Sequence, residues 1–314
     1  MKVFVTGVAG FIGSSIGRRL LSDGHSVVGI DCITDYYEPA AKRANLERLE
    51  SDNFQFVEED INAADLDKLL DGIEIVIHQA GQPGVRSSWG QEFDNYVDAN
   101  VLATQRLLEA SIRRPELRRF VYASSSSIYG DAETYPCLET DRPRPVSPYG
   151  VTKLAAEHLT TLYATNFGLP TVSLRYFTVY GPGQRPDMAF TRFLKAAVRS
   201  EPVTIFGTGE QIRDFTFVDD VVDANMRVAF EPIVPGSVLN VAGGSSVTVN
   251  EVLEMIAELH GRPLDIQRTS GVKGDVFRTG GSSEAIGRAV GWRPSTPLRE
   301  GLSRQYDWAA SWFG

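Results

Sequence analysis

The sequence predicts an α/β protein in which helices cover both faces of one doubly wound parallel sheet, with a smaller α/β domain beside it. Starting at Lys2, short runs rich in β-branched residues alternate with helical patterns, as in repeated β-α-β units. After Phe177 this alternation gives way to loops rich in glycine and proline. We therefore expect a first domain over residues 1–177, with returning segments near 215–245, and a second, interleaved domain over 178–314.

The composition is that of a folded globular protein with a sizeable core. The chain has 314 residues, of which 42% are hydrophobic and 23% are charged. Its net charge of -9, from 31 Lys plus Arg against 40 Asp plus Glu, opposes a general role in binding nucleic acid or an anionic membrane. Cys32 and Cys137 have neither metal-ligand nor redox-pair spacing, so we expect no metal site and, by default, a cytoplasmic location. No segment has the length of a membrane span or the apolar core of a signal peptide.

Six strands are expected in the main sheet, and their carboxyl ends should meet at one edge, where ligands of such sheets bind. These strands are Lys2–Thr6, Ser26–Ile30, Phe54–Val57, Glu74–His78, Arg119–Ala123 and Thr171–Phe177. The helices expected to cover the sheet are Phe11–Ser22 and Val97–Arg113. The elements expected after them are helices at Val249–His260 and Leu298–Trp312, and isolated strands near Val203–Phe206 and Val238–Val241.

A glycine-rich run, Thr6–Gly13, follows the first predicted strand and opens a helix. The glycines allow a tight turn and a close backbone approach, while the helix N-terminus faces a pyrophosphate. Glycines at such spacing also serve plain turns. Asp31 closes the second strand, where a carboxylate can accept a hydrogen bond from a ribose 2′-hydroxyl and repel a 2′-phosphate. The two features together predict NAD rather than NADP as the cofactor.

Other small and polar residues follow the third and fourth predicted strands and should reach the same edge of the sheet. Taken singly, Asp60 could equally cap a helix and Gly81 could equally form a turn. The residues assigned to the NAD site are Gly7, Gly10, Phe11, Ile12, Gly13, Asp31, Asp60, Ile61, Gln79, Ala80, Gly81, Asn100, Tyr149, Lys153 and Tyr176.

A proton-transfer pair is predicted where Ser147 and Pro148 begin a helix. Tyr149 and Lys153 lie one turn apart on one face of that helix and can act on one substrate. A phenol is a poor base at neutral pH, but a lysine ammonium and an oxidised nicotinamide nearby would favour the phenolate. The run Ser124–Ser127 follows the fifth strand and brings hydroxyls to the same edge. The alternative for the pair alone is a surface helix carrying an incidental Tyr and Lys.

The motifs TGxxGxxG, Asp31, SSSSIYG and YxxxK together resemble the extended short-chain dehydrogenase/reductase family of sugar-nucleotide epimerases and dehydratases. The resemblance covers essentially the whole chain, because matching motifs continue at Arg175–Pro182, Phe206–Gly209, Arg213–Asp220 and Gly274–Val276. It implies a Rossmann-like NAD domain, a UDP-sugar substrate, and a homodimer formed through a two-helix face of the large domain.

The resemblance also implies roles for individual residues. Tyr149 would be the base and acid at the sugar O4, Lys153 would hold the nicotinamide ribose and lower the pKa of that tyrosine, and Ser125 would be the bridging hydroxyl. Substrate-side residues follow from later motifs: Arg213 would hold the diphosphate, Phe206 would border the uracil, and Asp275 would reach the ribose or its neighbourhood. A core aromatic is an equally good interpretation of Phe206.

The reaction is predicted from what is missing beside the bridging serine. Dehydratases of this family carry an Asp-Glu pair there, and decarboxylases that make UDP-xylose carry a glutamate. This chain has Ser126 and Ser127, so it lacks an evident acid/base pair for eliminating water. The simplest fate of a 4-keto sugar is then return of the hydride to its other face, which is 4-epimerisation.

UDP-glucuronate is the predicted sugar, because Thr178 within RYFTVYGP, the run Arg185–Ala189 and the run Gly84–Ser88 resemble the UDP-glucuronate 4-epimerases of the family. Oxidation of glucuronate at C4 gives a β-keto acid that loses CO2 unless its carboxylate is held in an unfavourable orientation. Hydroxyl donors can do this without supplying an acid, and the candidates are Ser126, Ser127 and Thr178. The candidates for a positive field are Arg86, Arg185 and Arg192, each of which could instead form a solvated surface pair.

Two alternatives remain open. One is a 4-epimerase of neutral UDP-glucose or UDP-N-acetylglucosamine, with the same base and cofactor but different contacts around C5. The other is a catalytically silent NAD-binding regulator, because a fold alone does not prove activity. An intact set of Tyr149, Lys153 and Ser125 argues against the second alternative.

Overall fold

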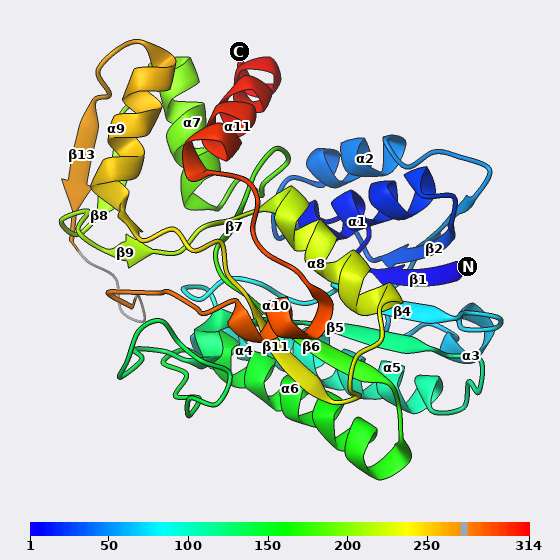
Figure 1. The fold of residues 1–314 in the computed structure, drawn as a ribbon. Coiled ribbons are helices and arrows are strands. Elements are labelled where there is room, and N and C mark those ends of the chain that lie inside the picture. Colours follow the sequence, from blue (N-terminus) through cyan, green and yellow to red (C-terminus); the bar gives the residue numbers. More distant parts are fainter. Residues whose placement is uncertain (271–275) are drawn as a thin grey trace.

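The structure, a computed structural model, describes residues 1–270 and 276–314. Its centre is a seven-stranded sheet in the order β11-β6-β5-β4-β1-β2-β3, in which every neighbouring pair is parallel (Figure 1). Its strands are β1 Lys2–Thr6, β2 Ser26–Asp31, β3 Phe54–Glu58, β4 Ile75–His78, β5 Arg119–Ser125, β6 Thr171–Tyr176 and β11 Ser237–Val241. The doubly wound parallel sheet predicted from the sequence is confirmed.

The last of these strands differs from the sequence prediction. The sequence predicts an isolated strand near Val238–Val241, within the segment expected to return to the first domain, whereas β11 pairs with β6 along the edge of the main sheet. The register runs from Ser237 opposite Val172 to Val241 opposite Tyr176. Because long loops and other elements separate β11 from β6 in the chain, local patterns could not identify this partner.

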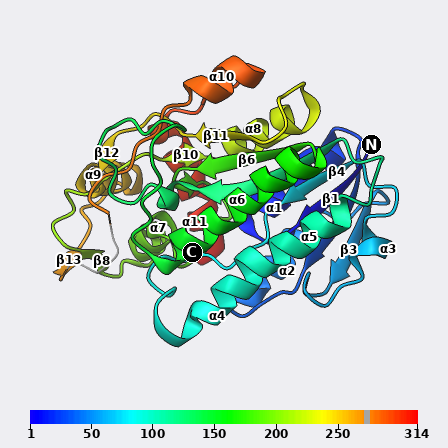
Figure 2. The same ribbon diagram turned by 90° about the horizontal axis from the view of Figure 1, so that it is seen from below.

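Helices cover both faces of the sheet, and strand residues alternate between two apolar cores. On one face lie α5 (Ala103–Ser111) and α6 (Pro148–Phe167), which Figure 2 shows side by side across the sheet. On the other face lie α1 (Phe11–Ser22) and α8 (Val218–Phe230), which pack against each other. On β1, for example, Phe4 belongs to the core beneath α5 and α6, whereas its neighbours belong to the core beneath α1 and α8.

The predicted helix Val97–Arg113 has a different form in its first part. Residues Val97–Leu102 form a π-helix, and only then does α5 begin. In this wider turn the Asn100 side chain accepts a hydrogen bond from the backbone N–H of Gln82 (2.8 Å) and donates one to Thr152 Oγ1 (3.0 Å). The π-helical turn thus fixes a polar side chain beside α6, and single π-turns are common at functional sites.

The segment after β6 builds a smaller unit in which α7 (Ala189–Arg199), α9 (Val249–His260) and α11 (Leu298–Phe313) pack together (Figure 1). Its short strands are β7 Val179–Tyr180, β8 Val203–Phe206, β9 Ile212–Arg213, β10 Thr216–Phe217, β12 Val247–Thr248 and β13 Ile266–Thr269. The remaining helices are α2 Pro39–Glu47, α3 Leu66–Leu69, α4 Phe93–Tyr96 and α10 Glu284–Val290, with 3₁₀ turns at Gly90–Glu92 and Ser126–Ile128. The division into domains at residues 177 and 178 stays a prediction.

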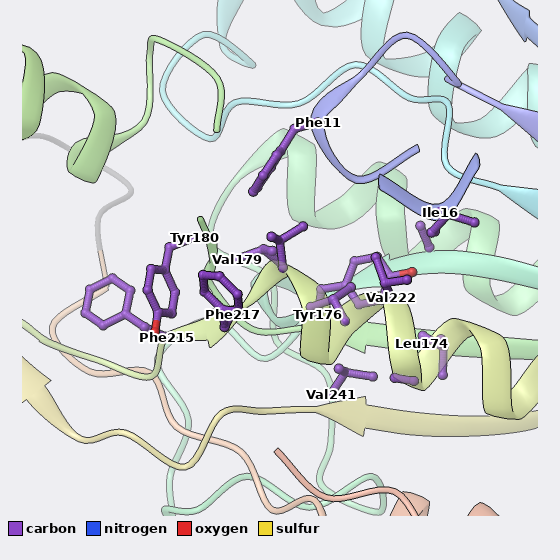
Figure 3. Close-up of a cluster of buried hydrophobic side chains, with 14 of the residues drawn as sticks. Phe11, Ile16, Leu174, Tyr176, Val179, Tyr180, Phe215, Phe217, Val222 and Val241 are labelled. Carbon is purple, nitrogen blue, oxygen red and sulfur yellow. The ribbon is translucent and has the colours of Figure 1, made fainter. Parts of the chain in front are cut away.

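One hydrophobic cluster continues from the sheet into this smaller unit. Figure 3 shows residues of the sheet and its helices, such as Phe11 of α1, Tyr176 of β6 and Val222 of α8. Near them lie Tyr180 of β7 and Phe217 of β10. The packing is aromatic here, with the ring centroids of Tyr180 and Phe217 at 5.4 Å in an edge-to-face arrangement. The shared core fixes the position of this smaller unit against the sheet.

A buried carboxylate attaches the C-terminal segment to this core. Asp220, in the first turn of α8, is 4% exposed and accepts hydrogen bonds from the backbone and hydroxyl of Ser295 (3.1 and 2.7 Å) and the backbone of Thr296 (3.1 Å). The indole of the fully buried Trp292 donates to the Asp220 carbonyl at 3.0 Å. This one residue therefore connects α8 to the chain that leads into α11.

We predict that Asp220→Ala lowers the free energy of unfolding by about 1.5–3 kcal/mol or more, because buried N–H donors lose a charged acceptor. Urea denaturation followed by circular dichroism measures the loss. The matched control is Asp219→Ala in the same helical turn, where the carboxylate forms a half-exposed ion pair with Arg304 and should contribute about 1 kcal/mol or less. Equal losses in the two variants would contradict the buried anchor.

Candidate functional site

The glycine-rich turn lies between β1 and α1 and leaves no room for a side chain at Gly7 or Gly13. Gly7 has φ of +65°, and its N–H donates to the carbonyl of Ile30 at 2.8 Å, which joins the turn to the end of β2. A Cβ on Gly13 would lie 2.1 Å from the Gly7 carbonyl oxygen. The backbone of the turn at Gly7 therefore lies against the first turn of α1, so that one pyrophosphate can contact the turn and the N-terminus of the helix.

Asp31 ends β2 and faces this turn. One carboxylate oxygen accepts from the N–H of Ala9 at 3.2 Å and the other from the N–H of Ile33 at 2.9 Å. The Nζ of Lys42, from α2, lies 4.0 Å from the same carboxylate and donates to Thr34 at 3.0 Å. Sequence reasoning missed Lys42, because nothing in the local pattern of α2 distinguishes it from a solvated lysine.

A cleft of about 640 Å³ extends along the carboxyl edge of the sheet. Asp31 ends β2 and Tyr176 ends β6, and these strands lie on opposite sides of β1 and β4, so the cleft crosses the sheet. All the residues predicted for the NAD site line this cleft: Gly7, Gly10, Phe11, Ile12, Gly13, Asp31, Asp60, Ile61, Gln79, Ala80, Gly81, Asn100, Tyr149, Lys153 and Tyr176. The donors and the shape of the turn fit a dinucleotide.

The start of α6 brings the predicted proton-transfer residues to the cleft. Ser147 caps the helix by accepting from the N–H of Gly150 at 3.1 Å, as its sequence predicts. A Cβ on Gly150 would lie 2.6 Å from the carbonyl oxygen of Ser127, so only glycine lets the helix approach the serine run so closely. Tyr149 is thereby placed beside Ser125, which belongs to β5 itself and not to a loop after the strand.

Burial opposes charge on both residues of the pair. Desolvation raises the pKa of Tyr149, while a hydrogen bond with Ser125 and the charge of Arg185 act to lower it. Burial lowers the pKa of Lys153 to about 7, and the carboxylate of Glu157 acts in the opposite direction. Lys153 is not among the groups that lower the pKa of Tyr149 in this structure. The predicted effect of Lys153 on that pKa, with NAD bound, stays a prediction.

The side chain of Lys153 is available for a ligand. Its Nζ lies 4.6 Å from the centre of the Tyr122 ring and makes no hydrogen bond to the part of the chain that the structure describes. A Cβ on Gly81 would approach Asn100 Oδ1 to 2.7 Å and this Nζ to 3.9 Å, so the lysine lies at the wall of the cleft. A buried ammonium with free donors suits the hydroxyls of a ribose.

Some of the predicted substrate residues line the cleft and others lie outside its lining. Arg185 lines the cleft and holds Asp187 through two hydrogen bonds of 3.0 and 2.9 Å. Phe206 of β8 is half-buried, and the guanidinium groups of Arg86 and Arg192 lie 4.2 and 5.5 Å from its ring centre. The lining of the cleft does not include the other described residues of this set, which are Ser125, Ser126, Ser127, Thr178 and Arg213. Asp275 lies outside the described residues.

Arg213 lies on β9, close to the backbone of Phe277. Its Nη1 donates to the carbonyl oxygens of Ile212 (3.0 Å) and Phe277 (3.1 Å). Sequence reasoning also missed Tyr36, which lines the cleft, lies 3.3 Å from Ser87 Oγ and contributes to the electrostatic surroundings of Tyr149. Only the folded chain brings Tyr36 to this position.

Comparison with known proteins gives consistent matches. Residues 3–242 match the NAD dependent epimerase/dehydratase family. A UDP-glucuronate 4-epimerase of Thermodesulfobacterium geofontis is 36% identical, over 97% of this chain and 95% of the relative. A Bacillus subtilis protein named as an uncharacterized UDP-glucose epimerase is 40% identical, over 99% and 98%. The crystal structure of a Bacillus cereus UDP-glucuronic acid 4-epimerase with UDP-glucuronic acid and NAD superimposes with a TM-score of 0.96, at 40% identity, over 99% and 100%.

Among the described residues, no helix is both long and apolar enough to cross a membrane. The same residues contain no cluster of three or more His, Cys, Asp or Glu side chains placed to hold a metal ion.

We predict that Gly13→Ala weakens NAD binding at least about tenfold, because the new methyl group overlaps the Gly7 carbonyl and must displace the turn. Calorimetric titration of cofactor-free protein with NAD measures the loss. The matched control is Gly17→Ala, one turn along the same helix, where a Cβ meets only side-chain atoms, of Leu49 at 3.4 Å and Val8 at 3.6 Å, and alanine favours the helix. Equal affinities for NAD in the two variants would show that the turn tolerates the displacement.

Proposed function

Because the chain belongs to the NAD dependent epimerase/dehydratase family, we propose that it is a UDP-sugar 4-epimerase that interconverts UDP-glucuronate and UDP-galacturonate with NAD as its cofactor. The observation that carries this proposal is the placement of Tyr149 beside Ser125 at a cleft shaped for NAD. Asp31, which lines the same cleft, supplies the carboxylate expected to bind the adenosine ribose. Ser126 and Ser127 follow directly, where an eliminating enzyme needs carboxylates.

The proposed mechanism assigns a task to each residue of the pair. Gly7, Gly13 and Asp31 would hold NAD, which when bound would supply a hydride acceptor at C4 of the sugar and a hydride donor for the return step. Tyr149 removes the proton from the O4 hydroxyl and gives it back, Ser125 hydrogen-bonds to the same hydroxyl, and Lys153 holds the ribose and favours the phenolate. Between the two transfers the 4-keto sugar must turn over within the pocket, so that the hydride returns to its opposite face.

The sugar carboxylate and the nucleotide would be held by the substrate-side residues. Thr178, Ser126 and Ser127 would donate to the carboxylate without supplying an acid that assists loss of CO2. The positive field would come from Arg185, Arg86 and Arg192, and the last two flank the Phe206 ring, which would border the uracil. Arg213 would contact the diphosphate and Asp275 the ribose.

A second candidate substrate is UDP-glucose. The Bacillus subtilis relative, as similar to this chain as the Bacillus cereus enzyme, is named for that sugar. The proton-transfer residues would be the same for both sugars, so only the contacts around C5 decide between them.

The direct test is incubation of the purified protein with UDP-glucuronate and no added NAD, followed by separation of products by chromatography. We expect UDP-galacturonate to form, since epimerisation returns the hydride and the cofactor is retained. Faster conversion of UDP-glucose under the same conditions would assign the protein to neutral sugars.

We also propose a homodimer formed through the face that carries α5 and α6. Three apolar side chains on this part of the chain, Leu102, Val151 and Leu162, are 43%, 49% and 53% exposed, and a second copy packed on this face would bury them. Light scattering after gel filtration tests this state. Both cysteines are free thiols, which supports the proposal of a cytoplasmic location.

We predict that Tyr149→Phe lowers kcat at least about 100-fold, because it removes the proton-transfer hydroxyl and keeps the aromatic ring. NAD and UDP-glucuronate should bind nearly as in the wild type, as measured by calorimetry. A variant that retains more than about a tenth of the wild-type rate would rule out Tyr149 as the base.

We predict that Thr178→Ala slows turnover of UDP-glucuronate about 10-fold or more, because a lost hydrogen bond to a charged group costs about 1.5–3 kcal/mol. A larger share of the 4-keto intermediate should leave as a decarboxylated pentose product, which mass spectrometry detects. Thr178→Ser keeps the hydroxyl and should behave like the wild type. If the alanine variant slows UDP-glucose equally, Thr178 does not contact the carboxylate.

A further inference from the structure

A buried ion pair lies directly behind the proposed catalytic residues. Glu157 of α6 and Arg175 of β6 form two parallel hydrogen bonds, Nε to Oε2 at 3.0 Å and Nη2 to Oε1 at 2.7 Å. Their side chains are 3% and 5% exposed. Taking two charges out of water costs several kcal/mol each, and such a pair often adds no net stability. Its presence at this depth therefore suggests a role other than holding the fold together.

The pair is connected to both proposed catalytic elements. Glu157 lies one helical turn after Lys153, on the same face of α6. The hydroxyl of Ser124 donates to Glu157 Oε2 at 2.6 Å, and Ser124 directly precedes Ser125 on β5. One carboxylate thus fixes the end of the strand that carries the bridging serine and also lies near the lysine.

Arg175 is in turn held from the opposite side. Its Nη1 donates to the hydroxyl of Tyr129 at 2.6 Å and to the carbonyl of Glu139 at 3.2 Å. The hydroxyl of Tyr129 donates to Asn240 Oδ1, on β11, at 2.7 Å. The guanidinium is therefore fixed across β6 and β11, and it keeps the Glu157 carboxylate in a single orientation.

The charges around Lys153 give the carboxylate a second effect. The titratable groups that face this lysine are Tyr149 and Glu157 from α6, Tyr122 from β5 and His78 from β4. Burial and the charge of Lys153 lower the pKa of His78 to about 3, and burial raises that of Tyr122 well above its usual value, so both side chains are neutral near pH 7. Among these groups Glu157 supplies the negative charge that opposes the desolvation of the ammonium.

We propose that Glu157, oriented by Arg175, is a positioning residue of the active site: it holds Ser124 in place and keeps Lys153 charged inside an apolar wall. This proposal rests on the proposed function, since it assumes that the ammonium form of Lys153 is the active one. Loss of the carboxylate should then lower the pKa of Lys153. As the pH is raised, activity should therefore begin to fall at a lower pH than in the wild type.

The test compares the pH dependence of kcat for UDP-glucuronate in the wild-type holoenzyme and two variants. Glu157→Gln is isosteric and can still accept from Ser124, but it leaves Arg175 as an unpaired positive charge. We expect the alkaline limb of its profile to move down by about 1 pH unit or more, the usual effect of a neighbouring charge. The double variant Glu157→Gln/Arg175→Met removes both charges, which buried pairs tolerate better than loss of one partner. Its limb should move in the same direction by a smaller amount.

A merely structural pair gives a different result. Both variants would then have lower kcat or lower stability with an alkaline limb at the wild-type pH, and that outcome overturns the proposal. If Glu157→Gln does not fold, the double variant decides by the same criterion. Ser124→Ala serves as the control, because it removes the hydrogen bond without changing charge and should leave the position of the limb unchanged.

A measurement without substrate separates this proposal from the proposed function. The NMR titration of ¹³C-labelled lysine side chains in the NAD-bound protein follows Lys153 directly, with its signal assigned by loss in Lys153→Met. A lower pKa of Lys153 in both Glu157 variants supports the charge effect even if no UDP-sugar is turned over, in which case only the proposed function fails. An unchanged pKa alongside normal epimerase activity overturns the positioning role alone.

Discussion

The packing of α6 across β5 and β6 is the contact on which the site depends. Gly150 permits it, because any side chain there would meet the carbonyl of Ser127. Through this contact the phenol of Tyr149 reaches Ser125, and the ammonium of Lys153 comes to rest over the Tyr122 ring at the cleft wall. The parallel sheet then supplies the remaining geometry, since its strands all end at the edge where α6 begins.

Close packing at this edge has an electrostatic cost, because a phenolate and an ammonium are both least favourable where water is excluded. Arg185 opposes the effect at Tyr149, and Glu157 opposes it at Lys153. Among the described residues, Arg185 makes no hydrogen bond to Tyr149 and Glu157 makes none to Lys153, so each charge acts through space. The pKa of Lys153, about 7, lets this lysine exchange between its charged and neutral forms near neutral pH, whereas the raised pKa of Tyr149 favours the neutral phenol.

The smaller unit, with α7, α9 and α11, is attached to the sheet by a continuous hydrophobic core. Aromatic side chains such as Tyr180 and Phe217 continue the core of the sheet, and Asp220 ties the C-terminal segment to α8. An enzyme that turns a 4-keto sugar over within its pocket benefits from walls that keep their positions while the sugar moves. The shared core provides that rigidity without closing the cleft.

The sequence by itself determined the parallel sheet, the glycine turn, the NAD site and the pairing of Tyr149 with Lys153, because each depends on residues close together in the chain or on a repeated β-α-β rhythm. Only the tertiary structure decided the partner of β11, the π-helical turn that holds Asn100, and the approach of Lys42 to Asp31. These features arise from contacts between distant segments, whose register and side-chain directions are set by packing and leave no mark in local periodicity.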